Sequence, residues 1–148
     1  MSNISDYKSR NGNLSCSPEE LFYFVTDIRN FERFLPGNSI SDLEIGQDSC
    51  SFQVSMLGTV KISIAEKIMH SKVIFSGNAL HVNDFSLIMN ISETENNHTE
   101  ANITLVAEMN PLLKMVAEKP IANFLETLID GMEKFGEWKD LKGQNQPL

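Results

Sequence analysis

Glu66 is the carboxylate in this chain that is best placed to do acid–base chemistry. It continues the alternation of the apolar residues Val60, Ile62 and Ile64, so strict alternation directs its side chain inward. A carboxyl group buried there would have a raised pKa and could act as an acid or a base. The competing interpretation, which is preferred, is a strand end or bulge that turns Glu66 to solvent.

The other residues that could take part in catalysis or metal binding do not form a recognisable site. His70 and His81 fall in expected turns and His98 in a polar loop, where each side chain is expected to be solvated. The histidines lack helical ligand spacing, and the chain has no Cys-x-x-Cys, Gly-x-Ser-x-Gly or phosphate-binding glycine motif. We therefore expect no metal ion and no cofactor. Cys16 and Cys50 are interpreted as reduced packing residues rather than a disulfide.

Length and charge restrict the class of protein. The chain has 148 residues, of which 41% are hydrophobic and 22% charged, which is typical of one globular domain spanning residues 1–148. About five residues at the start and residues 140–148 are expected to fray. A net charge of −8 disfavours nucleic acid as a partner. The N-terminus lacks a signal-peptide pattern and no apolar run reaches membrane-spanning length, which predicts a cytoplasmic protein without stable membrane insertion.

Two short helices are expected in the first quarter of the chain. The run Ser17-Pro18-Glu19-Glu20 has the residues of a capping box, with proline at the first helical position. Leu21, Phe24, Val25 and Ile28 follow at helical spacing and make one apolar face. Asn30 begins a second short helical turn over residues 31–35, and Pro36-Gly37 ends it. These residues predict a small helix pair rather than one long helix.

A series of strands is expected in the middle of the chain. Apolar and polar residues alternate over residues 51–56, 59–64, 85–92 and 102–109, and a shorter apolar element covers 73–75. The polar residues 93–100 are typical of a hairpin loop. Such alternation gives a sheet with one apolar face, and short connections favour an antiparallel meander.

A long helix is expected to cover the apolar face of this sheet. Apolar residues keep three-and-four spacing after the start at Asn110-Pro111, namely Ile121, Phe124, Leu125, Leu128, Met132 and Phe135. Pro120 is expected to break or kink the helix near residues 118–119, or to begin a second piece. The fold class is therefore α+β, with a curved antiparallel sheet around a C-terminal helix and the small helix pair at one end. The expected order is one strand, two helices, six strands and a long helix.

Several stretches of the chain resemble the helix-grip, START-related superfamily (SRPBCC), which includes polyketide cyclases and lipid-transfer domains. They are SCSPEELF (15–22), DIRNFERFLP (27–36), NPLLKM (110–115) and KPIANFL (119–125). The last two look like the helical C-terminus of a small bacterial subgroup of unknown function. The resemblance extends from about Asp6 to Trp138, and its motifs are architectural rather than catalytic. It implies a cavity between helix and sheet that binds apolar or amphipathic small molecules, without implying a reaction.

The apolar faces of the sheet and helix provide the candidate ligand wall. The candidates from the sheet are Phe52, Val54, Met56, Val60, Ile62, Ile64, Phe85, Leu87, Met89, Leu105 and Met109. Phe124, Leu128 and Met132 face them from the helix, and Phe31, Phe34 and Leu35 are placed near the mouth. A dry, filled core made of the same residues is the alternative, and periodicity does not separate the two.

The preferred function is binding or carriage of a hydrophobic or amphipathic small molecule or lipid by a noncatalytic protein, acting as a monomer or homodimer. An enzyme of the cyclase/aromatase or dehydratase type is a second hypothesis, because Glu66 could supply a pocket carboxylate. A third hypothesis is a protein-interaction module, since some members of the resembled superfamily are chaperone-associated.

Overall fold

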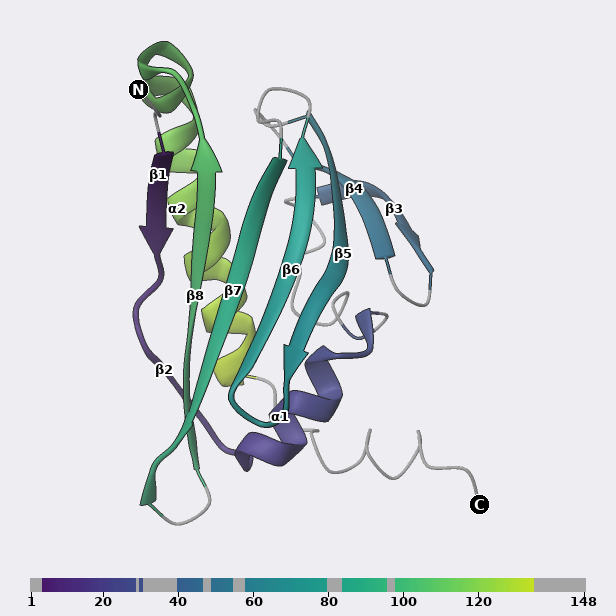
Figure 1. Ribbon diagram of the computed structural model, residues 1–148, viewed down its shortest axis with the longest axis vertical. Helices are drawn as coiled ribbons and strands as arrows, with labels where there is room; N and C mark the ends of the chain where they lie inside the picture. The colour runs from purple at the N-terminus through teal and green to yellow at the C-terminus, as the bar shows by residue number, and fades with distance from the viewer. Residues whose placement is uncertain are drawn as a thin grey trace.

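The computed structural model describes residues 4–28, 30, 40–46, 49–54, 58–79, 84–95 and 98–134. These residues form one antiparallel sheet and two α-helices (Figure 1). The elements in chain order are β1 (Ile4–Lys8), β2 (Gly12–Leu14), α1 (Pro18–Val25), β3 (Ile40–Ile45), β4 (Ser49–Val54), β5 (Gly58–Ile68), β6 (Lys72–Ala79), β7 (Asp84–Glu93), β8 (Thr99–Glu108) and α2 (Pro111–Lys134). The predicted α+β class and element order are confirmed.

The sheet is a meander from β3 to β8 whose far edge is completed by the N-terminal strands. The strand order is β1-β8-β7-β6-β5-β4-β3, and β2 also pairs with β8. The expected first strand is therefore divided in two along β8, with Ile4 opposite Glu108 and Gly12 opposite Ala101. Ile4 and Ser5, expected to fray, belong to β1. Residues 140–148 lie outside the described part of the chain.

The capping box at the start of α1 forms as predicted. The Ser17 hydroxyl accepts a hydrogen bond from the Glu20 backbone N–H at 3.1 Å, and the Ser17 N–H donates to Glu20 Oε1 at 2.9 Å. Pro18 occupies the first turn, where the proline's missing N–H costs nothing. The helix lies against β6 and β7 at one end of the sheet (Figure 1). The predicted second helix over residues 31–35 falls outside the described residues.

Alternation along the strands gives the sheet one buried face. In β7 and β8 every second residue is buried, as the sequence pattern predicts. β5 and β6 run longer than the expected 59–64 and 73–75. β3 is one of the six strands expected in the order, although the sequence pattern assigned no residues to it. The strand β3 pairs with β4 across a register shift between Ser41 and Glu44. Such a shift interrupts the regular alternation that sequence reasoning depends on.

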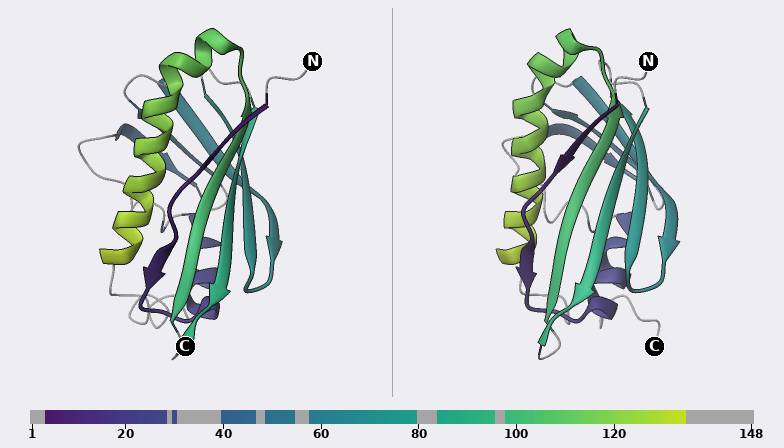
Figure 2. Two further views of the ribbon diagram at one scale, coloured as in Figure 1. Left: turned by 90° about the vertical axis from the view of Figure 1, so that its left-hand side faces the viewer. Right: turned by 60° about the vertical axis from the view of Figure 1, so that its left-hand side comes forward.

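The helix α2 continues through Pro120 instead of dividing there. Proline has no N–H to offer the carbonyl four residues earlier, so the helix loses one internal hydrogen bond at Val116. Figure 2 shows the axis bending in the N-terminal third of the helix, which fits the predicted kink. The predicted break is not observed. No helix among the described residues is both long enough and apolar enough to cross a bilayer.

The sheet curves around α2, and the core lies between them (Figure 2). From Ala117 onward one side of α2 is buried, through Ala117, Ile121, Leu125, Leu128, Ile129 and Met132. The helix backbone comes closest to β1, β2 and β8 at one side of the sheet. The predicted arrangement of a one-sided sheet covered by the C-terminal helix is confirmed.

Candidate functional site

Most of the predicted ligand wall faces the interior between the sheet and α2. The buried members are Phe52, Val60, Ile62, Phe85, Leu87, Met89, Leu105, Met109, Leu128 and Met132. Ile64 and Phe124 are partly buried and pack against this core. Phe31, Phe34, Leu35 and Met56 lie outside the described residues, as does the side chain of Val54.

Strand register joins the wall residues into rows across the sheet. Ile64 lies opposite Phe75, Phe75 opposite Leu87, Leu87 opposite Leu105, and Leu105 opposite Tyr7. This row brings inward-facing side chains from β5, β6, β7, β8 and β1 to the same level of the interior. Phe75 and Tyr7 were missed as wall residues from the sequence, although Phe75 shares the parity of the buried Val73. Only the pairing places them there.

An aromatic pair connects α2 to the far side of the sheet. The rings of Phe124 on α2 and Phe52 on β4 are stacked, with centroids 6.1 Å apart and an interplanar angle of 23°. Because the helix backbone lies nearer to β1, β2 and β8, this contact is made by long side chains reaching across the interior. Stacked rings at this separation attract each other beyond the effect of burial alone.

The interior holds few polar side chains among the described residues. Ser5, Ser9, Asn30 and Thr99 are the buried polar ones, and none of them is charged. Thr99 donates a hydrogen bond of 2.6 Å to the backbone carbonyl of Cys16. This bond ties the start of β8 to the segment leading into α1. The interior of the described structure therefore suits an apolar or weakly polar group.

Burial raises the pKa of two thiols and one tyrosine hydroxyl in this interior. Both cysteines are buried free thiols, as predicted. Burial, with a smaller contribution from the charge of Glu20, raises the pKa of Cys16 to about 12. Burial raises the pKa of Cys50 to about 11. Burial and the negative charge of Glu118 also raise the pKa of Tyr7. All three groups therefore stay neutral at physiological pH.

Glu66 lies outside this interior. The register between β5 and β6 shifts between Ile64 and Glu66, so a bulge interrupts the alternation that would direct the carboxylate inward. The Glu66 side chain is exposed. The bulge interpretation of the sequence describes the observed position, and Glu66 supplies no buried carboxyl group.

His70 is the histidine with an unusual environment. It lies in the turn between β5 and β6 with φ of 62°, and its ring packs edge-on against Phe22 and Tyr23 at centroid distances of 5.5 and 5.7 Å. Its Nε2 is buried without a hydrogen-bond partner in the described chain. His70 is thus partly buried rather than solvated, because α1 covers the turn. His98 is exposed, as expected, and His81 lies outside the described residues.

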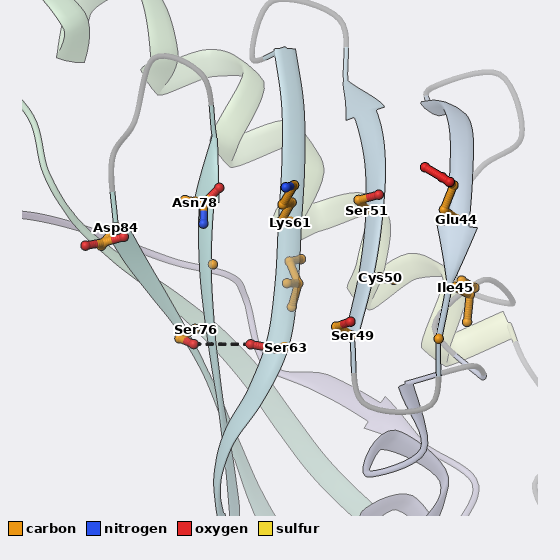
Figure 3. A pocket seen from close by; sticks show the side chains of 13 residues that line it. Glu44, Ile45, Ser49, Cys50, Ser51, Lys61, Ser63, Ser76, Asn78 and Asp84 are labelled. Carbon is orange, nitrogen blue, oxygen red and sulfur yellow. Dashed lines mark hydrogen bonds between the residues drawn. The ribbon is translucent and has the colours of Figure 1, made fainter.

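A hollow of about 740 Å³ lies on the opposite, outer face of the sheet (Figure 3). Its polar lining comes from β3 to β7: Glu44, Ser49, Ser51, Lys61, Ser63, Ser76, Asn78 and Asp84. These residues alternate with inward-facing neighbours such as Cys50, Ile62 and Phe85. Sequence reasoning missed this site because its polar members are spread over five strands, with one or two on each.

Two rows of cross-strand partners organise the outer hollow. In the first row Glu44 lies opposite Ser51, Ser51 opposite Lys61, Lys61 opposite Asn78, and Asn78 opposite Asp84. Figure 3 shows these five side chains next to one another across the sheet.

The second row consists of serines. Ser49 lies opposite Ser63, and Ser63 opposite Ser76. The hydroxyls of Ser63 and Ser76 are 3.5 Å apart (Figure 3). The hollow therefore offers several hydroxyls, one amide and one ammonium group, with a carboxylate at each end of the first row.

Comparisons with known proteins find similarity in structure only. No family model matches the sequence, and no curated protein matches it either. A norcoclaurine synthase point mutant from Thalictrum flavum in complex with a transition-state analogue has a TM-score of 0.66 and 10% identity, covering 87% of this chain and 96% of that chain. The protein XoxI from Bacillus cereus has a TM-score of 0.66 and 15% identity, covering 96% and 99%. A START superfamily protein from Mycobacterium smegmatis has a TM-score of 0.61 and 12% identity, covering 88% and 97%.

Proposed function

We propose that this chain, which has the helix-grip fold of the START-related superfamily, binds and carries a hydrophobic or amphipathic small molecule between the inner face of its sheet and α2. The carrier acts as a monomer or homodimer in this proposal.

The observation that carries the proposal is an apolar inner face that is wider than the helix covering it. α2 lies against β1, β2 and β8, whereas apolar side chains of β4, β5 and β6 line the same interior farther away. The long side chain of Phe124 reaches across to Phe52. A molecule lying beside the helix would contact both, and burial of its apolar surface would contribute about 25 cal/mol per Å².

The fold comparison gives secondary support. The norcoclaurine synthase mutant of similar fold was solved with a small molecule, a transition-state analogue, bound to it. The described interior of the present chain indicates what kind of ligand would fit. Its wall is apolar, and its hydroxyl and thiol groups are neutral. A molecule with a large apolar part fits that wall better than a charged one.

Native mass spectrometry of freshly purified protein, followed by organic extraction, tests the proposal. We expect a copurifying apolar species in stoichiometric amount, or uptake of one equivalent of an added long-chain fatty acid. Leu87 lies in the middle of the inner face, so Leu87→Trp should displace the bound species while the circular dichroism spectrum stays folded. Ser86→Ala, on the neighbouring residue of β7, should retain it.

Two outcomes would contradict the proposal. One is a wild-type protein that remains free of ligand after incubation with the fatty acid. The other is equal retention by Leu87→Trp and Ser86→Ala, which would place the bound species away from the inner face. The second outcome would leave the fold intact and move the site elsewhere.

A protein-interaction module is the second candidate, and one observation favours it. Leu112, Met115 and Val116 are 74%, 77% and 57% exposed and lie at helical spacing on the outer side of α2. An exposed apolar cluster of this kind is typical of a contact surface. If it joins two copies of the chain, sedimentation should detect a dimer that Met115→Ser weakens.

The cyclase/aromatase or dehydratase hypothesis loses the residue on which it was based. It depended on Glu66 as a pocket carboxylate, and Glu66 is exposed on a bulge. A reaction in the interior would need its acid or base from another residue.

A further inference from the structure

The first row of the outer hollow has a symmetrical pattern of charge. Lys61 stands at the centre of the first row, between the neutral residues Ser51 and Asn78. Glu44 and Asp84 occupy the two ends of that row. The pattern along the row is therefore negative, neutral, positive, neutral, negative.

Lys61 has no ionic partner in the described structure. The ion pairs of the described residues all involve Arg10, so neither Glu44 nor Asp84 pairs with Lys61. Lys61 is separated from each carboxylate by two strand-to-strand steps, about 9.5 Å between Cα atoms. Ser51, the partner of Lys61 on β4, adds a hydroxyl donor next to it in the row (Figure 3). An ammonium group and a hydroxyl together can bind a carboxylate.

We propose that the outer hollow binds a small zwitterion of the ω-amino-carboxylate type, with its carboxylate at Lys61 and its ammonium group at Glu44 or Asp84. Lys61 and each carboxylate lie two strand-to-strand steps apart. β-Alanine, a short ω-amino acid, serves as the probe ligand. The hollow lies on the face opposite α2, so this site is independent of the proposed interior site.

Titration of ¹⁵N-labelled protein with three matched compounds at pH 7 tests this proposal. The compounds are β-alanine, butyrate, which lacks the ammonium group, and propylamine, which lacks the carboxylate. We expect β-alanine to shift the backbone amide signals of Ser51, Lys61, Ser63 and Asn78. Because the charged groups are exposed, binding should be weak, and β-alanine should bind about fivefold more tightly than butyrate or propylamine.

Variants of the hollow test which residues bind the carboxylate and which bind the ammonium group of the ligand. Lys61→Gln should abolish the shifts caused by β-alanine and by butyrate, whereas Lys67→Gln, on the same strand but outside the hollow, should leave them unchanged. The double variant Glu44→Gln/Asp84→Asn should bind β-alanine and butyrate equally. All four positions are exposed, so the variants should keep the wild-type pattern of dispersed signals.

Three results would overturn the proposal. The first is equal affinity of the wild-type protein for β-alanine and butyrate, which would indicate a simple anion site. The second is unchanged β-alanine binding in Lys61→Gln. The third is the absence of localised shifts at 50 mM β-alanine.

Discussion

At the scale of single residues, Gly12 determines how closely α2 approaches the sheet. A Cβ atom at Gly12 would lie 2.8 Å from Ile129 Cγ2 and 3.6 Å from the side chain of Glu133. Ile129 is completely buried, so its branched side chain has little room to move. The missing side chain of Gly12 is therefore part of the packing between β2 and α2.

Gly12→Ala should lower the free energy of unfolding by about 1–3 kcal/mol, because the added methyl group overpacks the helix interface. Urea denaturation measures the change. Gly46→Ala is the matched control, since its added Cβ would meet only ordinary contacts, the nearest at 3.5 Å from the Ser49 carbonyl oxygen. If the two variants were equally stable, the close approach at Gly12 would have no energetic consequence.

The buried thiols should make stability fall at alkaline pH. Burial raises the pKa of Cys16 to about 12 and that of Cys50 to about 11, whereas an unfolded thiol ionises near pH 9. Above pH 9 the unfolded chain releases thiol protons that the folded chain keeps, so unfolding becomes easier as pH rises toward 11. Cys50→Ala should reduce this loss by up to about 1.4 kcal/mol per pH unit. Urea denaturation between pH 8 and 10.5 compares the slopes, and equal slopes would contradict the burial of the thiol.

At the scale of elements, Arg10 joins the connection between β1 and β2 to α2. Its guanidinium group pairs with Glu126 at 3.2 Å, with Glu133 at 2.9 Å, and with Asp130. The backbone N–H of Arg10 also donates to Glu126 at 3.1 Å, and that of Asn13 donates to Glu133 at 2.9 Å. Hydrogen bonds from Arg10 and from the Asn13 backbone lower the pKa of the Glu133 carboxyl group.

Arg10→Gln should lower the melting temperature slightly at neutral pH, because the cluster is exposed and screened by solvent. A lowered carboxyl pKa stabilises the fold above the unfolded value of about 4.3, and this stabilisation disappears as pH falls through the folded value. The difference from wild type should therefore shrink below about pH 4.3 and in 1 M NaCl. Thermal melts measure it, with Lys8→Gln on β1 as the exposed control. A difference independent of both salt and pH would indicate a packing role for Arg10 instead.

At the scale of the whole molecule, the two faces of the sheet differ in polarity. The inner face packs against α2, and the stack of Phe124 on Phe52 connects this helix to β4. The outer face presents the polar hollow from β3 to β7. The molecule therefore separates an apolar interior from a charged external surface by the thickness of one sheet.

Phe124→Ala should destabilise the fold by about 2 kcal/mol. The value lies below the range for a completely buried phenylalanine because Phe124 is only partly buried. Leu112→Ala, on the exposed side of the same helix, should change the free energy of unfolding by about 0.5 kcal/mol or less. Guanidinium denaturation distinguishes the two. Equal effects would mean that the aromatic pair contributes nothing to holding α2 across the sheet.

Local sequence patterns determined much of the fold. The capping box at Ser17 and Glu20 needs residues only three positions apart, and it forms as expected. The alternation in β7 and β8 is likewise a property of neighbouring residues, so the buried face of each strand could be predicted. The helical spacing of Leu125, Leu128 and Met132 predicted the side of α2 that faces the sheet.

Only the tertiary structure decided how these elements meet. The bulge that turns Glu66 outward, the place of Phe75 in the wall and the row centred on Lys61 all depend on register between strands. Register is set by contacts between residues far apart in the chain, and a shift of one residue exchanges the two faces of a strand. The sequence by itself therefore determined which residues are apolar at which period, whereas pairing and curvature decided which of them share a site.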